Sequence, residues 1–309
     1  MGLLVPKPLL FLRDNIVKKG SLLALPKAKW AKDLNLPKEG DWLLFGGCGY
    51  QYLSLGKTFS SMAQRMEGFG VELEGSFRLL KWFLPFLRFF LNGRNPLRSA
   101  LKVLSQEGIE VSYLGEEEPC CGAPLYFSGF RKDFLENLSS KRDFLSNRKK
   151  IIGMVPSCCY ALKELWGLKD LVEPFPIFWL KNKKKKRRLK EPLKVTYHDP
   201  CILSRYLGVV EEVREILRDI EGLTLVEAEA SGQWANCCGG GGGFELVFPY
   251  VSGELAKRRA EELLSTGAQL IVTACPGCLI NLEEGVKALG KKVRVLDLVE
   301  LLEETEIVA

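Results

Sequence analysis

Short apolar runs rich in β-branched residues alternate along this chain with stretches of helical periodicity. The apolar runs predict strands at residues 42–45, 109–113 and 151–155, and again at 193–197, 223–227, 270–273 and 293–296. Helical periodicity predicts helices at 211–220 and 254–264 and a closing helix at 297–304. Because strands and helices alternate, we expect right-handed crossovers and mostly parallel sheets. The pattern therefore predicts an α/β protein.

Cysteines follow these predicted strands in both halves of the chain, and the later set repeats the earlier one. The two sets are Cys48, Cys120, Cys121 and Cys158, then Cys201, Cys237, Cys238, Cys275 and Cys278. Cys238 and Cys275 are 37 residues apart, as are Cys121 and Cys158. Since the carboxyl ends of parallel strands lie at one edge of a sheet, each set is expected to converge there. A duplicated metal-binding unit explains this repeat better than incidental buried cysteines do.

The earlier set is incomplete. Aligning Pro156-Ser157-Cys158 on Pro276-Gly277-Cys278 places Val155 at the position of the first cysteine of the later CxxC motif. Cys159, which follows directly, has no counterpart in the later set. The five later cysteines exceed the four of a tetrahedral zinc site, whereas four suit either zinc or a small iron-sulfur cluster. The repeat therefore predicts two unlike sites.

With 309 residues, 47% of them hydrophobic and 27% charged, the chain is long enough for two domains with buried cores. Ten cysteines would suit a secreted disulfide scaffold, but such scaffolds are usually short and carry a secretory leader. Residues 1–11 contain one lysine and two prolines, and no cleavage site of small residues follows them. We therefore expect a reducing, cytoplasmic location in which the cysteines bind metal or do redox chemistry.

A run of basic residues at 181–190 carries much of the formal net charge of +6. Because like charges repel one another, residues 181–191 are interpreted as a solvated linker between the two halves. A patch for nucleic acid or an anionic membrane is the alternative. No aromatic side chains are interleaved with these charges for stacking, so nucleic acid is not expected as a partner.

The segment between Cys48 and Cys120 contains an insertion, because these cysteines are 72 residues apart and Cys201 and Cys237 only 36. The surplus includes residues 77–91, an apolar helix with non-apolar or helix-breaking positions at 78, 81, 85, 88 and 92. This helix is too short and too polar to span a bilayer. A helix buried under the core, a helix that docks a partner and a helix on a membrane surface all remain open.

The order C, CCG, CxxC, occurring twice, resembles the CCG-domain iron-sulfur proteins. These include the B subunit of heterodisulfide reductase, the catalytic half of its D subunit, and related subunits of lactate-, glycolate-, glycerol-3-phosphate- and succinate-oxidising systems. The similarity covers roughly residues 10–305, and Tyr197-His198-Asp199-Pro200-Cys201 also fits that family. It implies two tandem, internally repeated CCG domains, each a small, mostly parallel sheet flanked by helices. The implied division is an N-terminal extension at 1–40, a first domain at 41–180 with a helical insertion at about 60–96, the basic linker at 181–191 and a complete second domain at 192–309.

The resemblance also implies which residues bind metal. One noncubane [4Fe-4S] cluster, the site of the chemistry, would be held by Cys201, Cys237, Cys238, Cys275 and Cys278. The earlier set would hold a [4Fe-4S] cluster, a [2Fe-2S] cluster or zinc through Cys48, Cys120, Cys121 and Cys158, and a complete noncubane cluster there would need Cys159 or a non-cysteine ligand. His198, the only histidine, is expected either to hydrogen-bond within its turn or to donate a proton to a bound thiolate. The five glycines at 239–243 would bring backbone N–H groups close to the cluster.

The implied function is that of an iron-sulfur redox subunit of a heterodisulfide-reductase-like complex, an oxidoreductase of sulfur metabolism that reduces or forms disulfide or persulfide-type bonds. The chain has no compact C-x2-C-x2-C-x3-C run, so a ferredoxin-like iron-sulfur subunit, with or without a flavoprotein, is expected to supply electrons. One alternative is an electron-transfer or anchoring subunit of a membrane- or quinone-linked dehydrogenase, peripheral on the inner face of the membrane through residues 77–91. Another is a zinc-bound interaction module without redox activity.

Overall fold

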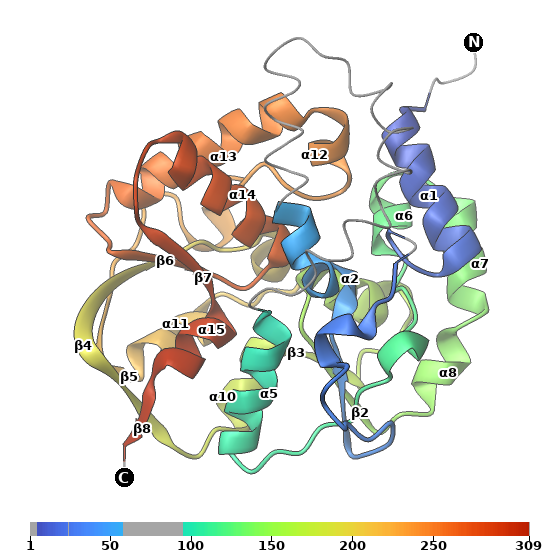
Figure 1. The fold of residues 1–309 in the computed structure, drawn as a ribbon, viewed down its shortest axis with the longest axis horizontal. Helices are drawn as coiled ribbons and strands as arrows, with labels where there is room; N and C mark the ends of the chain where they lie inside the picture. The colour runs from blue at the N-terminus through green and yellow to red at the C-terminus, as the bar shows by residue number, and fades with distance from the viewer. Residues whose placement is uncertain (1–4, 24, 58–94, 309) are drawn as a thin grey trace.

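Two α/β halves lie side by side in the computed structural model (Figure 1). The structure describes residues 5–23, 25–57 and 95–308. Within these ranges, no helix has the length and apolar character needed to cross a bilayer. Residues 77–91, with the three roles considered for them, lie outside the described residues, as does most of the insertion at 60–96.

The first half contains a small parallel sheet with the strand order β1-β2-β3. Its strands are β1 Trp42–Phe45, β2 Lys150–Gly153 and β3 Val172–Pro174. Instead of the strand predicted at 109–113, only Ser112 pairs with this sheet, in a single parallel bridge to Leu43. The Ser112 amide donates to the Trp42 carbonyl, but the next amide, that of Tyr113, turns away to the carbonyl of Pro37 at 2.8 Å. The ladder stops there, so the predicted strand is wrong in its extent.

The second half contains a larger sheet with the order β5-β4-β6-β7, all parallel, and β8 pairs antiparallel with the start of β4. Its strands are β4 Lys186–Tyr197, β5 Ile220–Leu225, β6 Leu270–Thr273, β7 Arg294–Asp297 and β8 Glu306–Val308. Each of the four strands predicted in this half is present. The two parallel sheets with their flanking helices confirm the predicted fold class.

Short helices and turns surround both sheets. In the first half they are α1 Lys7–Lys19, η1 Ala28–Ala31, α2 Gly47–Gln51, α5 Pro96–Gln106, η3 Gly115–Glu117, α6 Ala123–Phe127, α7 Arg131–Ser139, α8 Arg142–Ser146, α9 Pro156–Tyr160, η4 Ala161–Leu165 and α10 Phe175–Asn182. In the second half they are η5 Ile202–Tyr206, α11 Glu211–Arg218, η6 Gly232–Trp234, α12 Phe244–Val247, α13 Pro249–Leu264, α14 Pro276–Ala288 and α15 Leu298–Glu304. The helices predicted at 211–220, 254–264 and 297–304 are α11, α13 and α15.

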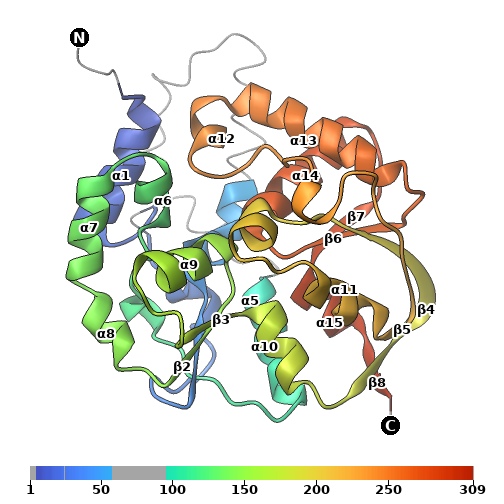
Figure 2. The same cartoon turned by 180° about the vertical axis from the view of Figure 1, so that it is seen from behind.

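The second sheet is covered on both faces. Figures 1 and 2 show α13 and α14 on one face and α11 and α15 on the other. The last helix, α15, begins at a capping box, in which the Asp297 side chain accepts from the first turn and Glu300 reaches back to the Asp297 amide at 3.0 Å. It also packs against α5 of the first half. One hydrophobic core therefore runs from the first sheet, through Leu44 and Ile152, into the second half.

The basic run predicted as a solvated linker is partly buried. Residues 186–190 belong to β4, and the Arg187 side chain is 3% exposed. Its Nη2 lies 3.1 Å from Oε1 of Glu107, and its guanidinium stacks 5.0 Å above the ring of Trp179. Glu107 also accepts from the backbone amides of Lys184 and Lys185. Residues 186–191 belong to β4 and are therefore not a linker, although Lys186, Arg188 and Lys190 are exposed as expected. Arg187 is buried because the carboxylate of Glu107 supplies the partner that offsets its charge.

Candidate metal centres

The earlier cysteine set converges at the carboxyl end of the first sheet. Cys48 lies in α2 directly after β1, Cys120 and Cys121 precede α6, and Cys158 lies in the first turn of α9 after β2. The Sγ atoms of Cys121 and Cys158 are 3.2 Å apart. Cys121 and Cys48 both lower the pKa of Cys120, as close neighbours of its sulfur would. These four residues form what we call the first cysteine group, and three of them are buried while Cys48 is half-buried.

The later set converges in the same way beside the second sheet. Cys201 precedes η5, Cys237 and Cys238 lie in the loop before the glycine run, and Cys275 caps α14, whose first turn contains Cys278. The Sγ atoms of Cys238 and Cys278 are 3.1 Å apart. Cys237 lowers the pKa of Cys238, and Cys238 and Cys275 raise that of Cys278, while burial and the charges of Cys275 and Cys238 raise the pKa of Cys201. We call these five residues the second cysteine group.

Each group contains one thiol that is easily deprotonated. Hydrogen bonds from Cys237, Cys278 and His198 hold the pKa of Cys238 well below its usual value, although its burial opposes this. Hydrogen bonds from Cys121 and Cys48 do the same for the pKa of Cys120. A thiol that donates its hydrogen to such a sulfur holds its own proton more tightly. The pKa of Cys278, which donates to Cys238, is therefore raised. A metal cation can bind a thiolate that is surrounded by thiols and displace the protons of those thiols.

The glycine of each CCG motif has a backbone that other residues rarely adopt. Gly122 has φ 74° and Gly239 has φ 84°. This conformation turns the glycine N–H back to the first cysteine of the motif, and the Gly239 amide lies 3.3 Å from Sγ of Cys237. A Cβ at Gly122 would lie 2.8 Å from the ring of Phe134, and one at Gly239 would overlap the carbonyl of Ser252. Close backbone approach to the sulfur therefore requires glycine at both positions.

Val155 takes the place of a fifth thiolate in the first group. Val155 and Cys275 are equivalent, since each is the extended N-cap of a helix with proline at its first position. A Cβ built on Gly47 would lie 2.8 Å from Cγ2 of Val155 and 2.9 Å from Sγ of Cys158, so the valine methyl group stands beside the sulfurs. The sulfur of Cys159 instead fills the space over Gly153 in β2. The structure thus leaves Cys159 out of the first group.

The two groups differ in access to solvent. Cys237 is exposed, and Cys201 and Cys275 are partly exposed. The segments beside these cysteines expose large aromatic side chains, including Trp234, which is 83% exposed, and Tyr206. Three members of the first group are buried. A substrate or partner can therefore reach the second group far more easily than the first.

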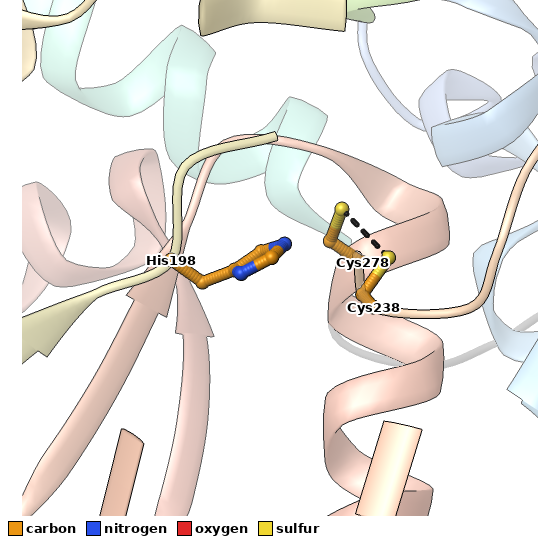
Figure 3. A group of neighbouring side chains, drawn as sticks. All are labelled: His198, Cys238 and Cys278. Atoms are coloured by element: carbon orange, nitrogen blue, oxygen red, sulfur yellow. Dashed lines mark hydrogen bonds between the residues drawn. The ribbon is translucent and has the colours of Figure 1, made fainter. Parts of the chain in front are cut away.

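His198 lies at the end of β4 and is buried against the second group. One ring nitrogen of His198, the sulfur of Cys238 and the sulfur of Cys278 all lie within 4.8 Å of one another. Figure 3 shows the outer nitrogen of the ring directed towards these two sulfurs. Its Nδ1 accepts a hydrogen bond from Nε of Arg259 at 3.1 Å. Of the two roles predicted for His198, donation to a bound thiolate needs this proximity, whereas the hydrogen bond of the ring runs to α13 and not within its own turn.

A short helix of the first half connects the two groups. In α2, Gly49 lies against the CxxC turn, because a Cβ there would be 2.5 Å from Cγ of Pro276. The next residue, Tyr50, is buried and donates a hydrogen bond to Asp297 at the end of β7. Burial raises the pKa of Tyr50, and the charges of Asp297 and Cys275 add to this effect. The helix that contains Cys48 therefore touches the CxxC turn that holds Cys275 and Cys278.

Three of the polar residues that support the groups could not be identified from the sequence. Glu118 is buried and accepts from the amides of Gly46 and Gly47 at 2.7 and 2.9 Å, which fixes the turn before Cys48. Its burial raises its pKa to about 7. Arg259 and Asp297 likewise bind residues far away in the chain. In the sequence, each of these three appears only as a charged residue at an otherwise apolar position. Such a position does not indicate which distant residue it contacts.

The donor sets fit a soft metal. Both groups consist of sulfur donors alone, the ligand type shared by zinc and iron-sulfur clusters. The Sγ–Sγ distances of 3.1 and 3.2 Å are shorter than the about 3.8 Å between two thiolates bound at about 2.3 Å to one tetrahedral ion. A small outward movement of the sulfurs would therefore admit a metal. Four thiolates complete one tetrahedral ion, whereas the fifth in the second group calls for more than one metal.

Comparison with known proteins agrees with this duplication. A model of the cysteine-rich domain called CCG matches the chain twice, at residues 87–163 and 195–283. The second match contains the entire second group, and the first contains every member of the first group except Cys48.

Of three curated relatives, two are reductase subunits by name and the third is named for lactate utilization. The D subunit of dihydromethanophenazine:CoB–CoM heterodisulfide reductase from Methanosarcina barkeri is 31% identical over 230 residues, which is 66% of this chain and 53% of the relative. The B subunit of fumarate reductase (CoM/CoB) from Methanothermobacter marburgensis is 33% identical over 66% of this chain and 42% of its own length. Lactate utilization protein A of Oceanobacillus iheyensis is 27% identical over 66% of this chain and 88% of its own length. The chain spans about half the length of the heterodisulfide reductase relatives that it matches.

Proposed function

Because the chain belongs to the family of proteins built on the cysteine-rich CCG domain, we propose that it is an iron-sulfur redox subunit of a heterodisulfide-reductase-like complex. The family itself agrees with the resemblance predicted from the cysteine motifs. In this role the chain reduces or forms disulfide or persulfide-type bonds. The observation that carries the proposal is the second cysteine group, in which five thiols converge beside a buried histidine and an exposed edge.

The second group is the proposed site of this chemistry. Its ligands to a noncubane [4Fe-4S] cluster would be Cys201, Cys237, Cys238, Cys275 and Cys278. Such a cluster supplies electrons one at a time and iron that captures sulfur, whereas converting a disulfide into two thiols takes two electrons and two protons. The chain itself holds the five sulfurs and leaves Cys237 open to substrate, and His198 stands close enough to serve the thiolate of Cys238.

The first group is proposed to hold a simpler metal centre. Four thiolates suit a [4Fe-4S] cluster, a [2Fe-2S] cluster or zinc. Val155 blocks the position of a fifth ligand, and Cys159 packs against β2, so neither completes a noncubane site. Since α2 joins Cys48 to the CxxC turn of the second group, the first centre would either stabilise this contact or pass electrons across it.

Partners are part of the proposal. The relatives named as reductases are subunits, so a ferredoxin-like iron-sulfur subunit, with or without a flavoprotein subunit, is proposed as the partner that supplies electrons. The substrate is proposed to be a disulfide or a thiol, and the location cytoplasmic. The domain division at 41–180 and 192–309 also stays a proposal, with the linker shortened by the residues that belong to β4.

Metal analysis and spectroscopy test the proposed function. After anaerobic purification or reconstitution of the full chain, iron and acid-labile sulfide should be present, and an EPR signal of the oxidised protein should change when thiol is added. Cys238→Ser should abolish that signal. Cys159→Ser is the matched control, because this buried thiol lies outside both groups, and it should leave the signal unchanged. Zinc in both groups and no iron would overturn the proposal in favour of a zinc-bound interaction module.

An electron-transfer subunit of a dehydrogenase is the second candidate. It is favoured by the relative named lactate utilization protein A, 88% of which aligns with this chain. In that case the iron-sulfur signal would be reducible but would not respond to thiols. Co-sedimentation with liposomes, with and without residues 77–91, tests the proposed membrane contact, and equal binding by both would remove it.

A further inference from the structure

A chain of buried polar side chains leads from the surface of α13 to the second cysteine group. Glu262 Oε1 lies 2.8 Å from Nη1 of Arg259, whose side chain is fully buried. Nε of Arg259 lies 3.1 Å from Nδ1 of His198. A ring nitrogen of His198 in turn lies beside the sulfurs of Cys238 and Cys278, with the three atoms within 4.8 Å of one another. The order is therefore carboxylate, guanidinium, imidazole and sulfur.

Arg259 determines where the hydrogen of the His198 ring lies. A guanidinium has only donors, so Nδ1 of His198 must accept from it and carries no hydrogen. The ring hydrogen then lies on Nε2, the outer nitrogen that points to the sulfurs of Cys238 and Cys278 in Figure 3. The group that faces the sulfur of Cys238 is consequently an N–H donor and not a lone pair.

This hydrogen pattern argues against His198 as a metal ligand. A histidine that binds a metal usually donates its other ring N–H to a carboxylate or a carbonyl. Here the other nitrogen receives a hydrogen bond from Arg259 instead. Ligation through Nε2 would leave both nitrogens without hydrogen, so His198 is better described as a neighbour of the Cys238 and Cys278 sulfurs than as a third metal ligand.

We propose that Arg259 is a positioning residue that fixes His198 as an Nε2–H donor to the thiolate of Cys238 and so raises the reduction potential of the centre held by the second group. The first part concerns the chain alone, and the effect on the potential rests on the proposed function. Hydrogen bonds to cluster sulfurs stabilise the more negative, reduced form, and this is a recognised way to tune iron-sulfur potentials. The first group has no such device, since the chain has one histidine.

The first test measures the hydrogen position directly. In the full chain, kept reduced and metal-free, labelling with ¹⁵N-histidine gives only two ring signals, because His198 is the only histidine. The expected spectrum shows hydrogen on Nε2 and none on Nδ1. A spectrum with hydrogen on Nδ1, or with a mixture of both forms, would overturn the proposal without any variant.

Variants then test the role of Arg259. Arg259→Met removes the donor and the charge, and Arg259→Lys keeps the charge but puts a methylene where Nε stands. Both should lose the single Nε2–H form. Arg258→Met is the matched control, because Arg258 is the exposed neighbour, and it should keep the wild-type spectrum. If Arg259→Met does not fold, the lysine variant decides, and a wild-type spectrum from it would contradict the assigned role.

The second test uses the reconstituted protein. The reduction potential of the second centre should fall in Arg259→Met and in Arg259→Lys, and stay unchanged in Arg258→Met. An unchanged potential in both Arg259 variants would contradict the tuning role. The two proposals fail separately: a chain that assembles no iron-sulfur cluster refutes the proposed function, whereas a cluster beside a histidine with hydrogen on Nδ1 refutes only the inference about Arg259.

Discussion

At the scale of single residues, one side chain distinguishes the two cysteine groups. Val155 has the extended backbone and the helix-capping position of Cys275, but it supplies methyl groups instead of a sulfur. The extra thiol of Cys159 does not compensate, because the next position along a helix points in another direction and this sulfur packs against Gly153. The alignment of the two halves identified Val155 from the sequence alone. The direction of the Cys159 side chain required the structure.

Replacing Val155 by cysteine should complete the first group. Val155→Cys is expected to raise the iron bound per chain after anaerobic reconstitution, because the first group then offers the same five thiolates as the second. Combining it with Cys238→Ser isolates the first group for iron analysis and EPR. Val155→Ser is the control of similar size and should bind no more iron than the wild type. Equal iron content in the cysteine and serine variants would contradict the account.

The glycine of the second CCG motif gives a prediction about stability. Gly239→Ala should destabilise the chain by more than the about 1–2 kcal/mol that a left-handed backbone costs, because its Cβ would also overlap the Ser252 carbonyl. Gly242→Ala is the matched control, with φ 66° and only an ordinary contact to Phe127, and should cost about 1–2 kcal/mol. Urea unfolding of the metal-free chain compares the two. Equal losses would show that the close approach at Gly239 is unimportant.

At the scale of elements, α2 and α15 carry the contact between the cysteine groups. The Tyr50 hydroxyl of α2 and the first turn of α15 both bind the Asp297 carboxylate. Apolar runs were sufficient to predict β1 before α2 and β7 before α15, whereas β8 after α15 was not predicted. They could not predict that the strand expected at 109–113 is a single bridge, since that depends on a hydrogen bond from Tyr113 to Pro37. Nor could a local pattern pair Tyr50 with Asp297.

Asp297 should make stability depend on pH. Burial raises its pKa from 3.8 to about 7 in the folded chain. The folded state therefore holds a proton that the unfolded state releases, and its stabilising contribution is complete below about pH 4 and is lost as the pH rises through about 7. Asp297→Asn keeps the helix cap and removes this dependence, so its free energy of unfolding relative to wild type should rise between these pH values.

Urea unfolding at several pH values measures this difference. Asp297→Ala serves for comparison, because it loses the cap and leaves Tyr50 without its acceptor. It should be destabilised at every pH by about 1–3 kcal/mol. A difference between the asparagine variant and the wild type that does not change with pH would refute the role of Asp297.

At the scale of the whole molecule, the halves share one core and are joined by a buried ion pair. Arg187 of β4 and Glu107 at the end of α5 are 3% and 0% exposed. Charge patterning alone suggested a solvated linker here, because the sequence does not reveal that a distant carboxylate meets the basic run. The cysteine repeat, by contrast, was sufficient to predict two converging groups, since each cysteine follows a predicted strand. The supporting contacts of Glu118 and Arg259 connect distant segments and had no such local signal.

Breaking the Arg187 pair should destabilise both halves together. Arg187→Met leaves the Glu107 carboxylate buried and without its cation, which costs about 3–5 kcal/mol. Adding Glu107→Gln should recover part of this loss, because a neutral amide can still accept from the amides of Lys184 and Lys185. Urea unfolding followed by fluorescence and by circular dichroism checks both points. A double variant no more stable than Arg187→Met would contradict the description of this pair.

The central claim is that the chain holds two unlike metal centres, with a multinuclear iron-sulfur centre in the second cysteine group. Anomalous X-ray diffraction at the iron and zinc edges, on crystals of the anaerobically prepared full chain, tests it most directly. The account predicts several iron atoms within bonding distance of Cys201, Cys237, Cys238, Cys275 and Cys278, and a smaller centre at Cys48, Cys120, Cys121 and Cys158. A single zinc ion in the second group, or the same centre in both groups, would contradict it.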